Sequence, residues 1–307
     1  MDNAISNSVQ LSIPSIRRSK LKEAINLYGC IRVLETHNPI SALIAENVNA
    51  NDVDSGMNVE YQGFWSSSLT DSVSRGKPDI EFLDIKSRML NISDIFEVTS
   101  KPLIIDGDTG GKVDHFLLNI RSLERLGVSA IIVEDKTGLK KNSLFGNEVE
   151  QEQATIGSFC TKIKRGKDSQ LTQEFMIIAR VESLILEAGM NDALERAFAY
   201  SESGADGVMI HSRSPDGQEI FEFAKEYRGK YPNKILVCVP TSYNEVKFNE
   251  LKNAGFNVVI YANHMLRAAY KAMEYSSKKI LQNGRTFETE PDLLSIRKIL
   301  DLVPGTR

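Results

Sequence analysis

The chain has 307 residues, a length typical of a single α/β barrel, and its content of 41% apolar and 25% charged residues is ordinary for a globular protein. A formal net charge of −4 argues against general nucleic-acid binding and against a basic membrane-surface patch. The three cysteines, Cys30, Cys160 and Cys238, form neither a disulfide framework nor a CxxC metal motif, which indicates a reducing cytoplasm. No segment approaches the ~18 apolar residues of a membrane span, and the N-terminus lacks signal-peptide features.

The predicted elements alternate along the chain. Residues 1–14 are polar and predict a loose arm, 49–56 are rich in turn residues, and 70–78 predict a loop. Apolar runs predict strands at 31–34, 61–65, 103–105, 131–133, 175–179, 208–210, 235–239 and 258–261. Helical spacing predicts helices at 15–27, 39–46, 80–96, 113–123, 152–163, 192–200, 219–227, 245–254, 265–273 and 293–302.

A weak internal repeat favours one architecture. Gly127, Gly204 and Gly255 each follow a helical pattern and precede an apolar strand, as a glycine at the end of a helix does. Eight strands alternating with helices imply parallel strands joined by right-handed crossovers. The sequence therefore predicts a single α/β domain over residues 1–307, a closed (β/α)8 barrel of the TIM type, with a doubly wound sheet as the alternative. Both folds place ligands at the carboxyl ends of the strands.

Acidic residues follow two of these strands. Asp106 and Asp108 come directly after one strand and Glu134 ends the next, so we expect the three carboxylates to converge. Asp106 and Asp108 are two positions apart and should point to the same side of an extended chain, with Gly107 between them allowing a ligand close to the backbone. Oxygen ligands without His or Cys suit Mg²⁺. The alternative is three unrelated surface acids.

Basic residues end the following two strands. Arg180 and His211 could bind carboxylate or phosphate oxygens beside a metal, although an arginine in a salt bridge and a core histidine are the alternatives. Lys136 could act as a base but sits beside two acids and should pair with them. With no thiol or Schiff-base nucleophile at a strand end, the sequence predicts metal-assisted handling of a small oxyanion.

The segment 130–146 starts as a buried strand and ends as a polar loop. The run Ile131–Val133 stops at Glu134, Asp135 and Lys136, and glycines follow at 138 and 146. Loops with glycine hinges commonly close over sites and exclude water, so 137–147 could be a lid that is mobile in the empty enzyme. A solvated strand-to-helix connection is the alternative.

Five separated motifs resemble a known family. The segments EDKTGLKKNSLFG, DGDTG, IARVESLI, GADGVMIHSR and YANHMLRAAY are similar in order and spacing to the phosphoenolpyruvate mutase family of the isocitrate lyase superfamily, from about residue 24 to 302. The resemblance implies an α/β barrel whose C-terminal helices, 264–307 here, are exchanged between subunits of a homotetramer. It also implies Mg²⁺ and the interconversion of phosphoenolpyruvate and phosphonopyruvate by an isomerase.

The resemblance also implies roles for individual residues. Asp106 matches the direct Mg²⁺ ligand, and Asp108 and Glu134 the acids that hold the ion through water. Catalytic roles fall to Asp79, Asn142, Arg180 and His211. Substrate-binding roles fall to Trp65, Ser67, Ser68, Leu69, Lys136 and Ser143. At Ser68 this chain departs from the pattern, because many relatives have glycine at that position.

The loop residue Asn142 separates the activities within the superfamily. The carbon–carbon lyases carry a cysteine in this loop, whereas this chain reads Lys140-Lys141-Asn142-Ser143. Phosphonopyruvate hydrolases depart from the mutases at the position of Asn142, so the asparagine favours the mutase. The alternatives are a hydrolase that yields pyruvate and phosphate and a non-catalytic barrel. Because the mutase equilibrium favours phosphoenolpyruvate, we expect a downstream enzyme that consumes phosphonopyruvate for phosphonate biosynthesis.

Overall fold

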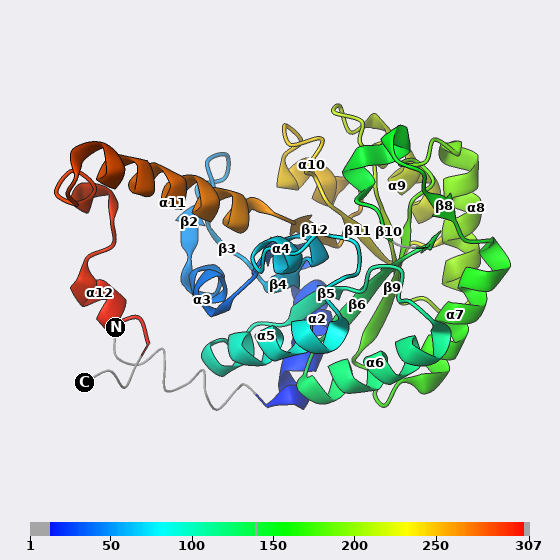
Figure 1. Cartoon of the computed structure of the whole chain (residues 1–307). Helices are drawn as coiled ribbons and strands as arrows, with labels where there is room; N and C mark the ends of the chain where they lie inside the picture. Colours follow the sequence, from blue (N-terminus) through cyan, green and yellow to red (C-terminus); the bar gives the residue numbers. More distant parts are fainter. Residues whose placement is uncertain (1–12, 139, 304–307) are drawn as a thin grey trace. The chain divides into compact units, whose positions relative to one another are not determined.

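The computed structural model describes residues 13–138 and 140–303, and the predicted arm at 1–14 lies almost entirely outside them. The chain divides into two compact units, Met1–Ala262 and Asn263–Arg307. The boundary between the units lies next to residue 264, where the helical C-terminal region was expected to begin. The first unit is a closed barrel and contains every predicted site residue (Figure 1).

Eight parallel strands form the barrel in the spatial order β1-β12-β11-β10-β9-β6-β5-β4, and the pairing of β1 with β4 closes it. Closure excludes the doubly wound alternative and confirms the predicted TIM-type barrel. All eight predicted strands are present, with ends that differ by one or two residues. The strands are β1 (Ile31–Glu35), β4 (Gly63–Ser66), β5 (Leu103–Asp106), β6 (Ala130–Glu134), β9 (Met176–Val181), β10 (Gly207–Ile210), β11 (Ile235–Cys238) and β12 (Val258–Tyr261).

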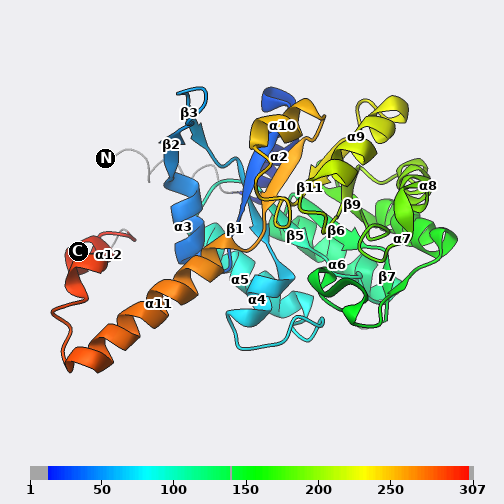
Figure 2. The same ribbon diagram turned by 90° about the horizontal axis from the view of Figure 1, so that it is seen from above.

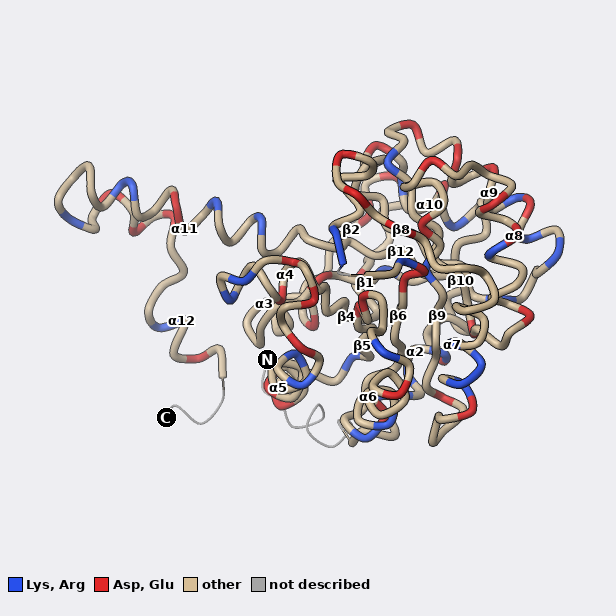
Figure 3. Tube along the Cα trace, turned by 45° about the vertical axis from the view of Figure 1, so that its right-hand side comes forward, with Lys and Arg blue, Asp and Glu red and all other residues tan. Residues whose placement is uncertain are grey.

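Helices surround the strands (Figure 2). They form because apolar residues recur at helical spacing, as in α6, where Phe116, Ile120 and Leu123 are buried. Basic and acidic residues are interspersed along them (Figure 3), in keeping with the small net charge. The helices of the barrel unit are α2 (Pro14–Tyr28), α3 (Pro39–Asn47), α4 (Ser68–Val73), α5 (Ile85–Val98), α6 (Val113–Leu126), α7 (Ile156–Ser169), α8 (Gly189–Glu202), α9 (Gln218–Lys230) and α10 (Phe248–Asn253).

The three glycines of the repeat share one conformation. Gly127, Gly204 and Gly255 have φ angles of 103°, 100° and 97°, which only glycine adopts readily. In each case the next strand begins three residues later, at the first residue of β6, β10 and β12. The repeat therefore fixes the point at which the chain enters the barrel.

The barrel core places the site. Alternate strand residues point inward and fill the interior, among them Ile104, Ile132, Ile178 and Met209. Two positions further along, the same inward-facing rows continue as polar residues at the carboxyl ends of the strands. These residues are Asp106, Glu134, Arg180 and His211.

Several predicted boundaries outside the barrel strands were wrong. The predicted loop 70–78 overlaps α4, and the predicted helix 80–96 begins only at Ile85, where the Asp84 side chain caps it. Residues 49–56 lie in a hairpin of β2 (Asn49–Asn51) and β3 (Asn58–Glu60). The start of the predicted helix 152–163 is instead β8 (Glu152–Gln153), which pairs antiparallel with β7 (Lys136–Thr137). In these segments the boundaries are set by a helix cap, turns and hairpin pairing, which the pattern of apolar residues does not show.

The second unit is helical. It contains α11 (His264–Asn283), η2 (Glu290–Asp292) and α12 (Ile296–Leu300), and α11 ends at Gly284 with a φ angle of 64°. The predicted last helix, 293–302, is shorter than expected. Among the described residues of the chain, no helix is both long enough and apolar enough to cross a membrane.

Candidate active site

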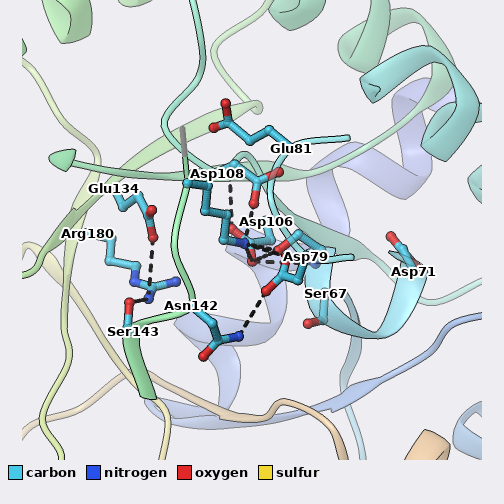
Figure 4. A network of polar contacts seen from close by, with 12 residues as sticks. Ser67, Asp71, Asp79, Glu81, Asp106, Asp108, Glu134, Asn142, Ser143 and Arg180 are labelled. Atoms are coloured by element: carbon cyan, nitrogen blue, oxygen red, sulfur yellow. Dashed lines mark hydrogen bonds and ion pairs between the residues drawn. The ribbon is translucent and has the colours of Figure 1, made fainter. Parts of the chain in front are cut away.

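The acids that follow β5 meet a lysine. Asp106 ends the strand, and its Oδ2 atom lies 3.7 Å from Nζ of Lys140, which also donates to Oδ1 of Asp108 (Figure 4). The two carboxylates converge as predicted, but for a different reason. Asp108 has a φ angle of 52°, so a left-handed turn rather than strand alternation brings it back, and its amide donates to Asp106 Oδ1 (3.1 Å).

Gly107 is required by the neighbouring strand. A Cβ atom at this position would lie 2.6 Å from Cγ1 of Ile131 and 2.9 Å from the carbonyl oxygen of Ile132. Both contacts are too close for a side chain. The close packing of β5 on β6 is therefore sufficient reason for a glycine here, and the expectation that it admits a ligand to the backbone stays a prediction.

Asp79 joins this cluster from the turn after α4. Its Oδ1 atom lies 3.1 Å from Nζ of Lys140, and Nδ2 of Asn142 donates to its Oδ2 atom at 2.9 Å (Figure 4). The same asparagine caps the short helix η1 (Ser143–Glu148) by accepting from the amide of Leu144. Lys140 thus contacts the acids that follow β5, and Asn142 contacts Asp79, an acid from the turn after α4.

The turn after β4 lies beside Asp106. Ser68 donates through Oγ to Asp106 Oδ2 at 2.8 Å and also contacts Lys140. Ser67 is buried at the start of α4, and Leu69 is half-buried. The indole nitrogen of Trp65 is buried and has no hydrogen-bond partner among the described residues. The turn therefore places a hydroxyl and an unused donor at the strand ends.

A second cluster surrounds Arg180. Its Nη2 atom lies 3.4 Å from Glu134 Oε2 and 3.0 Å from Nδ1 of His211, and its Nε donates to Glu182 Oε1 at 2.5 Å. Glu182 Oε1 is also 3.2 Å from Nδ1 of His211. Arg180 and His211 are therefore adjacent, as predicted. Glu134 belongs to this cluster rather than to the pair Asp106 and Asp108.

Lys136 and Ser143 connect the loop to the second cluster. Lys136 lies 3.2 Å from Glu134 and 3.4 Å from Glu182, so it pairs with two acids as expected, although one of them is not its neighbour in sequence. The Ser143 hydroxyl accepts from Lys136 (3.0 Å) and from Arg180 (2.6 Å) and donates to Glu182. Both residues lie within reach of an anion bound by Arg180.

Burial raises the pKa values of the carboxyl groups of the site, and the neighbouring cations lower them. Burial opposes ionisation of Asp106, but Lys140, Arg180 and Arg88 outweigh it and hold the pKa well below its usual range. Burial raises the pKa of Glu134 to about 7 despite Arg180 and Lys136. Burial and the charge of Arg180 lower the pKa of His211, which favours the neutral imidazole.

Three buried residues of the site were missed from the sequence. Lys140 lies within the motif EDKTGLKKNSLFG but was given no role. Glu182 follows Arg180 by two positions, so the alternation of side chains along a strand could have revealed that both point to the same side. Arg88 occupies a row of α5 that otherwise holds Ile92 and Ile95. A charged residue in the apolar row of a helix was the available signal.

The buried cluster carries more acids than bases. The described residues contain no group of three or more His, Cys, Asp or Glu side chains arranged around one metal position, because Lys140 lies between Asp106 and Asp108. Six carboxyl groups and four basic side chains are in contact here, a surplus of oxygen donors that suits a divalent cation. The carboxylates are Asp71, Asp79, Asp106, Asp108, Glu134 and Glu182, and the cations are Arg88, Lys136, Lys140 and Arg180.

The fold and these strand-end charges are those of an α/β-barrel enzyme with a buried, strongly charged site at the carboxyl ends of its strands. A model of the family described as phosphoenolpyruvate phosphomutase matches residues 21–281, so the chain belongs to that family. Its mutases are isomerases that transfer a phosphoryl group within one molecule.

Similar proteins include both mutases and hydrolases. The phosphoenolpyruvate phosphomutase of Tetrahymena pyriformis is 31% identical over 97% of this chain and 95% of its own. A crystal structure of phosphoenolpyruvate phosphomutase from Streptomyces platensis subsp. rosaceus has a TM-score of 0.84 and 33% identity, covering 93% of this chain and 94% of that one. A structure of phosphonopyruvate hydrolase with oxalate and Mg²⁺ has a TM-score of 0.81 and 32% identity, with the same coverage. Overall similarity therefore does not separate the two activities.

Proposed function

We propose that this enzyme is a Mg²⁺-dependent phosphoenolpyruvate mutase, which interconverts phosphoenolpyruvate and 3-phosphonopyruvate for phosphonate biosynthesis. The observation that carries the proposal is the contact of Asn142 with Asp79 at 2.9 Å, since Lys140 joins the same carboxylate to Asp106 and Asp108 after β5. In the mutase reaction a phosphoryl group leaves the enolate oxygen and is captured by the carbon of the same molecule.

The second cluster suits the transferring phosphoryl group. Nη2 of Arg180 lies 2.6 Å from Oγ of Ser143 and 3.0 Å from Nδ1 of His211. A phosphoryl group in a loose transition state spreads its charge over its oxygens, and fixed cationic and hydroxyl donors stabilise that charge. The neutral imidazole of His211 can donate a hydrogen bond without adding a proton to the substrate.

The loop decides between transfer and hydrolysis. Water that reached the phosphoryl group would give phosphate and pyruvate. Lys140, Asn142 and Ser143 of the loop contact acids that belong to the barrel, so a closed loop covers both clusters and excludes water. Its mobility in the absence of substrate remains a prediction.

The acids suit a divalent metal. Both carboxylate oxygens of Glu134 are buried without a hydrogen bond from any described residue, and the surrounding cluster holds more acidic than basic side chains. Asp106, Asp108 and Glu134 would hold Mg²⁺ through oxygen and water. The ion would supply positive charge to the carboxylate and enolate oxygens of the substrate. A metal in this place requires Lys140 to withdraw from between Asp106 and Asp108.

Phosphonopyruvate hydrolase is the second candidate. The similar hydrolase structure with oxalate and Mg²⁺ supports it, because a hydrolase needs the same acids and the same phosphoryl-binding residues. The asparagine at position 142 favours the mutase, as argued from the sequence. A non-catalytic barrel is disfavoured because the buried acids, Arg180 and His211 are all present. Each acid contacts a basic side chain, and Arg180 contacts His211.

We further propose a cytoplasmic homotetramer in which α11 is exchanged between subunits. All residues of α11 are described and none is buried, and large apolar side chains on it are exposed, among them Tyr270, Met273 and Leu281. Cys30, Cys160 and Cys238 are unpaired, in keeping with a reducing compartment. Light scattering tests the assembly, and a monomer at every concentration would contradict it.

Phosphorus NMR tests the reaction. Wild-type enzyme, Mg²⁺ and phosphonopyruvate should yield phosphoenolpyruvate, and the mutase equilibrium means that phosphonopyruvate should be nearly consumed. Phosphate as the first product would indicate the hydrolase. No change in the spectrum would support the non-catalytic alternative. A downstream enzyme that consumes phosphonopyruvate is needed to draw the reaction in the biosynthetic direction.

A further inference from the structure

Arg88 is a charged residue in an apolar position. It lies in the first turn of α5, outside the ring of strands, and only 1% of it is exposed. The other buried residues of this helix are Ile92 and Ile95, which follow at helical spacing. A buried guanidinium is stable only where acceptors satisfy its donors, so its partners indicate what it does.

The partners of Arg88 lie on two strand ends and one helix. Nε donates to Asp71 Oδ2 on α4 at 2.9 Å. Nη2 donates to the carbonyl oxygen of Ser66 at 2.9 Å and to its Oγ atom at 3.1 Å, at the end of β4. Nη1 donates to the carbonyl oxygen of Asp106 at the end of β5. One side chain therefore connects the ends of β4 and β5.

These strand ends carry the first of the two clusters of the proposed site, the one that contains the acids Asp106 and Asp108. Ser66 leads into the turn with Ser67 and Ser68, and Asp106 leads into the turn with Asp108. Nη1 of Arg88 lies 3.6 Å from Oδ2 of Asp108, whereas Lys140 contacts the other oxygen, Oδ1. Arg88 thus engages one oxygen of Asp108 and leaves the other available to the substrate side.

We propose that Arg88 is a positioning residue, which fixes the Ser66–Ser68 turn relative to the Asp106–Asp108 turn and so sets the geometry in which the acids receive a divalent cation. The inference deepens the proposed function and depends on it only for the identity of the ligand. Arg88 acts through the backbone and through Asp108 and touches neither metal nor substrate. A lysine could not replace it, because a single ammonium cannot span acceptors on three elements.

A second buried arginine provides a matched control. Arg17 on α2 is also fully buried, and it donates to the carbonyl oxygens of Phe96 (3.1 Å) and Lys101 (3.0 Å). Lys101 precedes β5, so these bonds lie at the opposite end of that strand from Asp106. An arginine-to-lysine change therefore removes similar buried bonds at both positions but disturbs the strand ends at only one.

The experiment compares Arg88→Lys with Arg17→Lys in the full chain. Both variants should lose thermal stability to a similar degree. Hydrogen exchange without metal should show faster exchange at the amides of Ser68 and Asp108 only in Arg88→Lys, because both amides donate to the Asp106 carboxylate. Calorimetry with Mn²⁺ as the probe should show binding about tenfold weaker or more for Arg88→Lys, the scale for losing a residue that orients metal ligands.

Equal Mn²⁺ affinity and unchanged exchange in Arg88→Lys would overturn the inference and leave Arg88 a purely structural residue. If that variant does not fold, Asp71→Asn decides, since it weakens only the Nε contact and should give a smaller loss of the same kind. Unaltered exchange and affinity in Asp71→Asn would then refute the proposal. A wild-type enzyme that binds Mn²⁺ without converting phosphonopyruvate would refute the proposed function alone. A wild-type enzyme that binds no Mn²⁺ would refute the metal, and the exchange data would still decide the role of Arg88.

Discussion

The strand ends and the lid supply the same site in different ways. The strand-end residues Asp106, Arg180 and His211 continue the inward-facing rows of the barrel core, so the strand ladder fixes them. The lid, residues 137–147, holds its position mainly through polar contacts, and among its described residues the large apolar side chains Leu144 and Phe145 are 43% and 50% exposed. Segments with few buried apolar contacts open at low free-energy cost.

The difference separates two tasks. The strand ends determine where charge is placed, and this requires rigidity. The lid determines whether water reaches that charge, and this requires a segment that can leave. Changes to the strand ends should therefore affect binding and turnover together, whereas changes to the lid should affect turnover with little effect on the metal.

The largest effect is expected at Asp106. Asp106→Ala should lower turnover by on the order of 10³-fold or more, because metal charge is worth several kcal/mol to a transition state. The fold should survive, since the residue ends a strand at the rim of the core. Steady-state kinetics measures the loss of turnover, Mg²⁺ titration measures the loss of metal binding, and circular dichroism checks that the fold survives. Normal turnover in this variant, or wild-type turnover in excess chelator, would contradict the metal assignment.

A lid substitution should separate turnover from metal binding. Asn142→Ala should lower turnover by on the order of 10²-fold, the scale for losing one positioned donor to transition-state charge. Mg²⁺ affinity should be nearly unchanged, because the acids belong to the barrel. Calorimetry beside kinetics tests this, and hydrogen exchange of the lid with and without Mg²⁺ and oxalate tests closure. Strong protection in both states would show that the segment is a fixed connection.

The two lid glycines should differ in their tolerance of a side chain. Gly146 has a φ angle of 48°, and a Cβ atom there would lie 2.1 Å from Cζ of Arg213, whereas Gly138 (φ 73°) has open space around it. A left-handed alanine costs about 1–2 kcal/mol, or roughly tenfold in the population of the closed lid. Gly138→Ala should show this cost alone.

Gly146→Ala should lower turnover further, because the backbone angles of Gly146 (φ 48°, ψ −130°) lie outside the left-handed helical region and suit only glycine. Arg213→Ser in the same chain should recover little, since the atoms in contact are the movable end of the arginine side chain. Single-turnover kinetics on the three variants provides the comparison. Equal effects at the two glycines would show that the backbone conformation of Gly146 does not restrict the lid.

The smallest effect is a pH dependence at Glu134. Burial raises the pKa of this carboxyl to about 7 in the folded protein from an ordinary value of 4.5, so the folded state binds its proton more tightly than the unfolded state. Its stabilising contribution is present below pH 4.5 and is lost as the pH rises through 7. Glu134→Gln should therefore gain stability relative to the wild type between pH 5 and pH 8. Urea unfolding of the metal-free proteins measures the difference, and a constant difference would contradict the shift.

Sequence reasoning located the strands because buried parallel strands are continuous apolar runs, and it located Asp106, Arg180 and His211 because they follow those runs. It gave the wrong partner set for Glu134, since this residue stands opposite Arg180 in the register of the neighbouring strands β6 and β9, and an apolar pattern does not show that register. It missed Arg88 because a helix pattern does not reveal which strand ends a long side chain can reach. The start of α5 was also misplaced, because the Asp84 cap competes with an apolar pattern that begins earlier.

The glycine repeat has a consequence for how such enzymes diversify. Gly127, Gly204 and Gly255 set identical entries into three strands at one end of the barrel, while the segments that leave the other end differ in length and structure. The glycines that fix where the strands begin and the residues that carry the chemistry thus lie at opposite ends of the barrel. A new reaction can arise by exchange of a single exit loop while every strand keeps its place. A family that holds a mutase and a hydrolase on one scaffold is the expected result of that separation.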